Sequence, residues 1–149
     1  MVTDAVISPH RGETFEVLLR TSKLTKLYRM GELEVLALDA VDFSAAAGEL
    51  VVILGPSGSG KSTFLNLIGG LDTPTSGDIW FGDYRLSGAR ESDLTRYRRE
   101  HVGFVFQFYN LVPSLTALEN VKLATEIVKR PMRAEEALEL VGLKDRMRH

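Results

Sequence analysis

The sequence has no cysteine, no long hydrophobic run and little net charge. Without cysteine the chain forms no disulfide bond and no cysteine-ligated metal site, which fits a reducing, cytosolic setting. No apolar run approaches the roughly 18 residues that a membrane-spanning helix needs, and residues 1–12 contain no signal-peptide core. A formal net charge of −2 does not predict a nucleic-acid-binding surface. We therefore expect a protein that reaches a membrane only through a partner.

The overall composition of the sequence and the spacing of its apolar residues are those of one folded domain. Hydrophobic residues make up 44% and charged residues 26%, which is typical of globular proteins. Alternating or unbroken apolar residues predict strands, and apolar residues three and four apart predict helices. The expected elements, in chain order, are antiparallel strands at residues 15–20, 23–28 and 35–43, a buried strand at 50–54, a helix from 64 that stops at Gly69-Gly70, a strand at 78–82, a helix at 92–100, a buried strand at 102–106, and helices after Thr116 and over 134–141.

The start of one of these helices is marked by a capping box. Thr116 precedes Glu119 by three residues, so each side chain can accept a hydrogen bond from a free backbone N–H group at the helix start. The pattern predicts a helix that begins after Thr116.

A glycine-rich loop follows the predicted strand at residues 50–54. The pattern G-x-x-x-x-G-K-[ST] of a phosphate-binding P-loop is matched by Gly55-Pro56-Ser57-Gly58-Ser59-Gly60-Lys61-Ser62. Glycines let the backbone point its N–H groups at phosphate oxygens, and the following helix begins with unpaired N–H groups and a positive dipole end. Lys61 would reach the terminal phosphates, Ser62 would offer its hydroxyl to Mg²⁺, and Thr63 would add a contact near the α-phosphate.

The alternative is a chance match in a flexible Gly/Ser loop. From average composition, such a match occurs in roughly one chain in a couple of hundred of this length. Here the loop lies between an apolar strand pattern and a helical apolar pattern, which is the context that a P-loop requires. We therefore favour phosphate binding.

The sequence around the loop resembles the ATP-binding-cassette (ABC) family. Four segments carry the resemblance: the Walker A segment GELVVILGPSGSGKST (residues 48–63), the L-x-x-P-x-x-G loop LDTPTSG (71–77), the Q-loop strand VGFVFQ (102–107), and the opening of the helical subdomain, YNLVPSLTALENV (109–121). The resemblance runs from about residue 23 to the end of the sequence. Residues 68–72 and 108–121 are most similar to the branch that serves lipoprotein release and macrolide export.

The resemblance implies roles for three further places in the chain. Tyr28 lies where the family stacks an aromatic ring on adenine, for which a flat π-face is suited. Gln107 lies where the family's glutamine contacts Mg²⁺ or the attacking water, and residues 108–116 lie where a permease coupling helix docks. Without the resemblance, Tyr28 would indicate simple packing, Gln107 the polar end of a strand, and residues 108–116 an ordinary apolar loop.

The predicted site can be stated by role. ATP would be bound by Tyr28, Gly55, Pro56, Ser57, Gly58, Ser59, Gly60, Lys61, Ser62 and Thr63. Mg²⁺ would be held by Ser62 and Gln107. The residues assigned to catalysis are Lys61 and Gln107.

The resemblance also implies a fold and an assembly. The expected fold is the α/β P-loop NTPase fold of the ABC ATPase type, incomplete, with an N-terminal antiparallel β-subdomain and the start of the helical subdomain. The expected divisions are a flexible extension at residues 1–14, an ATP-binding core at 15–107 and a partial helical subdomain at 108–149. The implied partners are a transmembrane permease and a second ABC ATPase in a homodimer, with no nucleic acid. The implied location is cytoplasmic, on the inner face of the cell membrane.

The sequence departs from the family by lacking its later motifs. The LSGGQ signature, the Walker B Asp-Glu pair and the switch histidine do not occur before the last residue, His149. We therefore expect a truncated or partial form without complete catalysis, because positioning and electrostatics account for nearly all phosphoryl-transfer catalysis. We also expect exposed apolar edges beside the strand at residues 50–54.

Three functions are left open by the sequence. The leading one is an ATP-binding subunit that couples ATP binding and hydrolysis to a permease. The second is a cassette that signals to a cell-wall enzyme through a membrane partner. The third is an ATP-binding fragment without hydrolysis. A P-loop kinase or GTPase fits least, because the context of Gln107 and the antiparallel N-terminal strands match neither.

Overall fold

A computed structural model describes residues 16–108, 110–126, 128 and 130–149. The extension predicted at residues 1–14 lies outside these described residues. The chain divides into two compact units, Met1–Thr95 and Arg96–His149. No helix within the described ranges has the length and apolar character that a membrane crossing requires.

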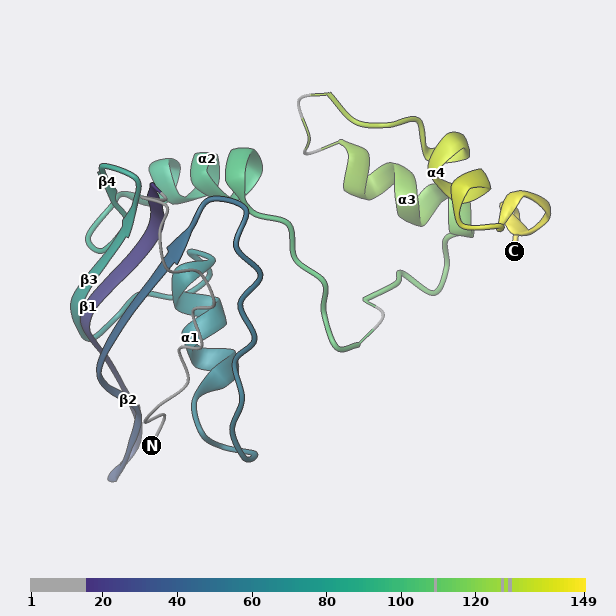
Figure 1. Cartoon of the computed structure of the whole chain (residues 1–149). Helices are drawn as coiled ribbons and strands as arrows, with labels where there is room; N and C mark the ends of the chain where they lie inside the picture. Colours follow the sequence, from purple (N-terminus) through teal and green to yellow (C-terminus); the bar gives the residue numbers. More distant parts are fainter. Residues whose placement is uncertain (1–15, 109, 127, 129) are drawn as a thin grey trace. The chain divides into compact units, whose positions relative to one another are not determined.

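The first unit is built on a four-stranded antiparallel sheet (Figure 1). β1 (Val17–Met30) lies between β2 (Leu33–Ala46) and β3 (Ser76–Phe81), and β4 (Tyr84–Arg85) pairs with the other edge of β3. The strands predicted at residues 35–43 and 78–82 are confirmed as β2 and β3. This sheet is the frame that positions the glycine-rich loop.

Within the described residues, one continuous strand, β1, replaces the two strands predicted at residues 15–20 and 23–28, so the predicted break between them is wrong. β1 passes this point through a β-bulge, with a register shift after Thr21 and a left-handed φ of 47° at Lys23. The backbone N–H of Lys23 donates to Asp42 Oδ1 at 2.7 Å. Because a side chain on β2 satisfies this N–H group, the bulge bends the strand without ending it.

The core of the first unit forms where α1 (Lys61–Ile68) packs against β2. The ring of Phe64 on α1 meets the ring of Phe43 on β2 edge to face, with the centroids 5.2 Å apart. The helix ends at Gly69-Gly70 as predicted, and Gly70 has the left-handed φ of 68° that glycine allows at a helix end. The largest fully buried side chains come from β1, α1 and β3: Leu24, Leu67 and Ile79.

Leu67→Ala should lower the free energy of unfolding by roughly 2–5 kcal/mol, because it removes buried methyl groups and leaves a cavity. Leu67 is 1% exposed, whereas Leu65 on the same helix is 49% exposed. Leu65→Ala is the matched control and should change the free energy of unfolding by less than about 1 kcal/mol. Urea unfolding of the two variants is the measurement. Equal losses would contradict the packing of α1 against the sheet.

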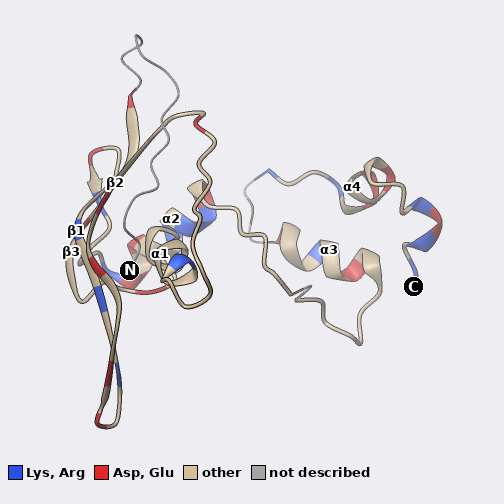
Figure 2. Cartoon of the chain, turned by 60° about the horizontal axis from the view of Figure 1, so that its bottom comes forward, with Lys and Arg blue, Asp and Glu red and all other residues tan. Residues whose placement is uncertain are grey.

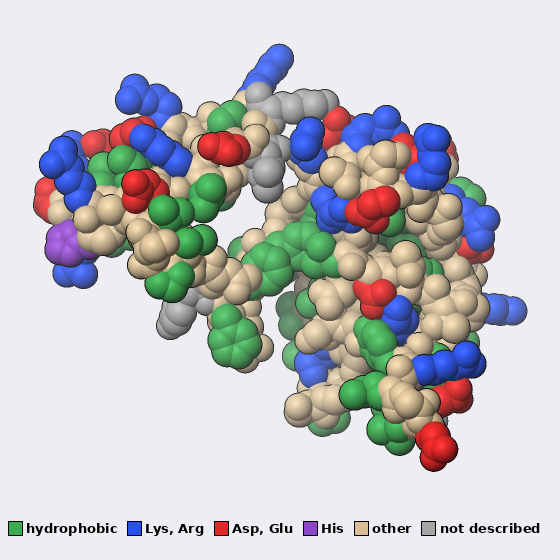
Figure 3. Space-filling model, turned by 180° about the vertical axis from the view of Figure 1, so that it is seen from behind, with side chains coloured by type: hydrophobic (Ala, Val, Ile, Leu, Met, Phe, Trp, Pro, Cys, Tyr) green, Lys and Arg blue, Asp and Glu red, His purple; other side chains and the backbone are tan. Residues whose placement is uncertain are grey.

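The buried strands predicted at residues 50–54 and 102–106 are not formed, and this part of the prediction is wrong. Both segments lack regular secondary structure, and Leu50, Val52 and Val105 are 90%, 62% and 101% exposed. Among the described residues neither segment has a neighbouring strand, and a strand without a neighbour leaves its backbone N–H and C=O groups to water. The apolar side chains of these segments are therefore exposed along irregular chain and not at the expected edges beside a strand, and Figure 3 shows apolar side chains open on the surface.

The second unit is helical. α2 (Glu91–His101) begins in the first unit and is followed by α3 (Ala117–Thr125), α4 (Ala134–Leu140) and the short 3₁₀ helix η1 (Lys144–Arg146). The helices predicted at residues 92–100, after Thr116 and over 134–141 are therefore confirmed. α3 and α4 contact each other, and Lys122 Nζ lies 3.3 Å from Glu135 Oε1 across this contact. Acidic and basic residues are mixed along these helices (Figure 2).

The capping box predicted at the start of α3 is also confirmed. Thr116 Oγ1 accepts from the Glu119 N–H at 3.3 Å, and Glu119 Oε2 accepts from the Thr116 N–H at 2.8 Å. The bond from the Thr116 N–H, and after it the bond that the Thr116 hydroxyl group donates to Glu119 Oε2 at 2.7 Å, lower the pKa of the Glu119 carboxyl group. A lowered pKa in the folded state means that this contribution is present above the unfolded-state pKa of Glu119 and is lost as the pH falls through the folded-state pKa.

Thr116→Ala should lower the free energy of unfolding by about 1 kcal/mol at neutral pH, because it removes the acceptor that caps α3. The loss should shrink in acid, where Glu119 is protonated in both proteins. Thr125→Ala, at the other end of the same helix, is the control and should change the free energy by less than about 0.5 kcal/mol. Thermal unfolding at neutral and acid pH measures both. A Thr116→Ala loss that did not change with pH would contradict the role of Glu119.

Candidate phosphate-binding site

The glycine-rich loop at residues 55–60 leads directly into α1. The helix begins at Lys61, and its N-cap residue Gly60 has a left-handed φ of 93° and provides no side-chain cap, whereas α3 has one. Within the described part of the chain, no acceptor is bonded to the backbone N–H groups of Lys61, Ser62 and Thr63. These N–H groups and the positive end of the helix dipole together favour an anion.

Gly60 fixes the loop against β2. A Cβ atom at this position would lie 2.4 Å from the Ala37 carbonyl oxygen and 3.0 Å from Leu38 Cδ2. Only glycine combines this close backbone approach with a left-handed φ. The position of the start of α1 is therefore set by β2.

The Lys61 ammonium group lies inside the loop. Its Nζ atom donates to the carbonyl oxygens of Gly55 and Pro56 at 2.7 Å each, and to Ser59 Oγ at 3.3 Å. Ser59 is buried, whereas the Ser62 hydroxyl group, one residue after Lys61, is on an exposed residue. The loop thus holds a positive charge beside a row of N–H donors, which is the arrangement that a phosphate chain requires.

The sheet places Tyr28 on the strand next to the one that supports the loop. Tyr28 on β1 pairs with Val35 on β2, two residues before the Ala37 carbonyl group on which Gly60 rests. One strand spacing and two residue steps separate the Cα atoms of Tyr28 and Ala37 by about 8 Å. The half-buried Tyr28 ring and the loop therefore belong to the same region of the first unit.

Two residues that the sequence did not single out contact Tyr28. The Tyr28 hydroxyl group donates to Asp72 Oδ2 at 3.0 Å, and Lys26 Nζ lies 4.9 Å from the centre of the Tyr28 ring. Lys26 could have been predicted from the sequence as a neighbour of Tyr28, because residues two apart on a strand share a face. Asp72 could not have been predicted in this way, because it lies far from the strand in sequence; its hydrogen bond to Lys26, for example, joins residues 46 positions apart.

Gln107 is the predicted site residue that the structure places in the second unit. Its side chain is exposed, in a segment without helix or strand. Its contact with Mg²⁺ or water stays a prediction. Residues 108–116, the predicted docking segment, include Tyr109, which lies outside the described residues. Within this segment, Val112 is held by the Asn120 side chain of α3. Asn120 Oδ1 accepts from the Val112 N–H at 2.8 Å, and Asn120 Nδ2 donates to the Val112 carbonyl oxygen at 3.2 Å.

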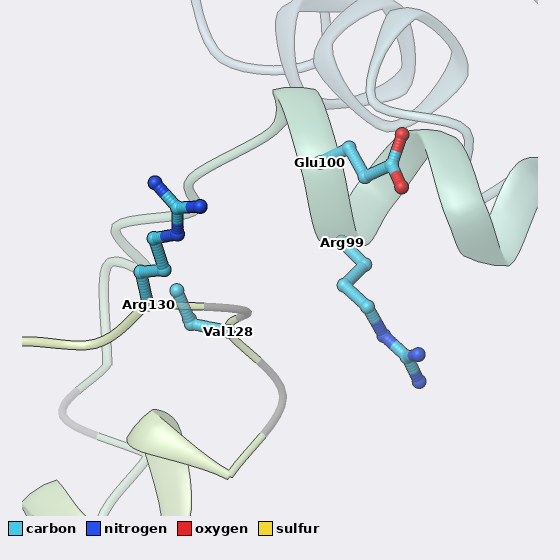
Figure 4. A pocket seen from close by; sticks show the side chains of 4 residues that line it. All are labelled: Arg99, Glu100, Val128 and Arg130. Carbon is cyan, nitrogen blue, oxygen red and sulfur yellow. The ribbon is translucent and has the colours of Figure 1, made fainter.

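The second unit also contains a pocket of about 440 Å³. It is lined by Arg99 and Glu100 of α2 and by Val128 and Arg130 of the segment after α3 (Figure 4). The side chains of Arg99 and Arg130 extend in different directions, and none of the predicted site residues lines the pocket. The pocket therefore has no assigned role in phosphate binding.

The chain is similar in sequence to many ABC transporter proteins. Residues 38–149 match the family described as ABC transporter. An uncharacterized ABC transporter ATP-binding protein of Thermotoga maritima is 48% identical over 129 residues, which cover 83% of this chain and 55% of that protein. The lipoprotein-releasing system ATP-binding protein LolD of Idiomarina loihiensis is 42% identical over 139 residues, which cover 90% of this chain and 61% of LolD.

The fold is similar to that of a solved ABC structure. The ATP-binding cassette MJ0796 of Methanocaldococcus jannaschii, in a dimeric post-hydrolysis state bound to ADP and Pi, superposes with a TM-score of 0.78 at 40% identity. The match covers 89% of this chain and 61% of that chain. The chain thus spans between 55% and 61% of the length of these three relatives. Because the family match extends over most of its residues, the chain belongs to the ABC transporter family.

Proposed function

We propose that this chain forms the nucleotide-binding core of an ABC transporter subunit, which couples ATP binding and hydrolysis to a membrane permease. The observation that supports this most is the position of Lys61. Its ammonium group lies within a loop whose following N–H groups have no acceptor among the described residues. Such a site suits the β- and γ-phosphates of ATP, because a fixed positive charge and backbone donors act together on the same anion.

The proposed binding site extends from the loop to Tyr28. The phosphates would lie against residues 55–63 and the adenine against the Tyr28 ring. The exposed hydroxyl group of Ser62, together with phosphate oxygens and water, would hold Mg²⁺. This donor set fits Mg²⁺, because the ion is usually bound through few protein ligands together with phosphate oxygens and water. When bound, Mg²⁺ would neutralise charge on the phosphates.

Hydrolysis, dimerisation and permease coupling belong to the whole protein in this proposal. The similar cassette MJ0796 is described as a dimer, which supports a dimer of the whole protein here. We assign residues 15–107 to the ATP-binding core and residues 108–149 to part of the helical subdomain. Residues 108–116 would face the permease, on the cytoplasmic side of the membrane.

Calorimetric titration of the 149-residue chain tests the proposal. Mg-ATP and inorganic tripolyphosphate should compete for one site, because both present a phosphate chain to the loop. Adenosine, which has no phosphate, should bind far more weakly. ATP binding that tripolyphosphate did not displace would show that the loop is not the phosphate site.

A further inference from the structure

A polar cluster joins Tyr28 on β1 to the loop that follows α1. The Asp72 carboxyl group accepts side-chain hydrogen bonds from the Tyr28 hydroxyl group at 3.0 Å and from Lys26 Nζ at 2.7 Å, and a backbone hydrogen bond from the Thr73 N–H at 2.7 Å. Lys26 Nζ also donates to the Thr73 carbonyl oxygen at 2.7 Å. Beside the cluster, the Leu27 N–H donates to Thr75 Oγ1 at 2.9 Å. The loop and the strand are therefore held together around the tyrosine.

The cluster constrains the Tyr28 ring at two points. The hydroxyl group is fixed by Asp72, and the Lys26 ammonium group lies over one face of the ring, 4.9 Å from its centre. A cation at this distance is attracted by the ring's electrons and occupies the face that it covers. A nucleobase can therefore stack only on the opposite face.

Asp72 carries the charge that keeps this arrangement together. Burial raises the pKa of its carboxyl group, but hydrogen bonds from Lys26, the Thr73 N–H and Tyr28, together with the charge of Lys26, lower it overall. The carboxylate is thus ionised at neutral pH. The Lys26 side chain is only 12% exposed, so this ion pair is better shielded from water than an ordinary surface pair.

We propose that Asp72 and Lys26 are positioning residues for Tyr28, which hold the ring so that adenine stacks on the face opposite Lys26. They would thereby set the part of the ATP affinity that comes from the base. This inference rests on the proposed function, because it needs Tyr28 to contact adenine. The competing explanation is that the cluster only fastens the loop to β1.

Two ligands measured on each variant separate these explanations. Mg-ATP uses both the base and the phosphates, whereas Mg-tripolyphosphate uses only the phosphate loop. The ratio of the two affinities therefore reports the contribution of the base. A loss of folded protein lowers both apparent affinities together and leaves the ratio unchanged. Tyr28→Ala calibrates the test, and it should weaken ATP binding roughly tenfold without changing tripolyphosphate binding.

Asp72→Asn and Lys26→Met are the test variants. Each should lower the ratio of ATP affinity to tripolyphosphate affinity by about threefold, a part of the loss expected when a stacked base is removed altogether. Asp78→Asn is the matched control, because Asp78 also accepts hydrogen bonds from a hydroxyl group and a basic side chain, those of Ser87 and Arg85. The ratio of ATP affinity to tripolyphosphate affinity of Asp78→Asn should equal that of the unchanged chain.

A double variant shows whether Asp72 acts through the tyrosine. In the Tyr28→Ala background, Asp72→Asn should leave the ratio unchanged, because no ring is left to position. Equal losses for both ligands in Asp72→Asn alone, or a threefold fall of the ratio in the Tyr28→Ala background, would overturn the inference and leave the proposed function intact. If the unchanged chain bound no tripolyphosphate, the proposed function would fail and the inference with it.

Discussion

Replacing Lys61 with alanine should weaken the binding of both ATP and tripolyphosphate by roughly 10- to 100-fold, the loss expected when charge-assisted hydrogen bonds are removed. The ammonium group is already held within the loop, 2.7 Å from the Gly55 and Pro56 carbonyl oxygens. Little reorganisation is therefore needed when it turns to a phosphate oxygen. Calorimetry with both ligands measures the effect.

Lys144→Ala is the control for the charge removed. Lys144 is 68% exposed and pairs with Glu139 in the second unit. Its loss changes the net charge as much as Lys61→Ala does, but it removes no group from the loop. Both affinities should stay within about twofold of the unchanged chain, since an exposed charge is screened by salt. An unchanged affinity in Lys61→Ala would show that the lysine does not contact the phosphates.

Gly60→Ala should reduce the stability of the first unit and also weaken phosphate binding. Its φ of 93° disfavours any residue with a Cβ atom, and the new atom would lie 2.4 Å from the Ala37 backbone oxygen. Strain and overpacking together should lower the free energy of unfolding by about 3 kcal/mol. Because the clash is relieved by moving the start of α1 away from β2, tripolyphosphate affinity should fall at least tenfold. Urea unfolding and calorimetry give the two readouts.

Gly82→Ala separates backbone strain from the clash. Gly82 also has a positive φ, 55°, but a Cβ atom there would meet nothing within 4 Å. Its turn between β3 and β4 is outside the candidate site. The free energy of unfolding should fall by about 1 kcal/mol, from strain alone, with phosphate binding unchanged. Similar losses of stability in the two variants would contradict the close packing of Gly60 on Ala37.

The local features of the fold could be predicted from the sequence because their determinants are close together in the chain. The P-loop pattern leading into α1, the helix stop at Gly69-Gly70 and the capping box at Thr116 each depend on a few neighbouring residues. The order of these elements was therefore predictable. The resemblance to the ABC family identified the family correctly, because the motifs that carry it lie within residues 38–149, which match the family.

Features that depend on distant residues could not be predicted in this way. An apolar run such as residues 50–54 predicts a buried strand only if another strand pairs with it, and none does among the described residues. The continuity of β1 depends on Asp42, which lies on the next strand and satisfies the Lys23 N–H at the bulge. The contact of Asp72 with Tyr28 depends on the path of the chain after α1, which no local pattern encodes.

The most direct test of phosphate binding by this loop is a titration of the ¹⁵N-labelled chain with Mg-ATP, followed by the amide resonances in NMR spectra. The largest shifts should occur at residues 58–63, because their N–H groups would donate to phosphate oxygens, and Lys61→Ala should diminish them. Shifts that instead centred on Arg99 and Arg130, at the pocket of the second unit, would contradict phosphate binding at the start of α1.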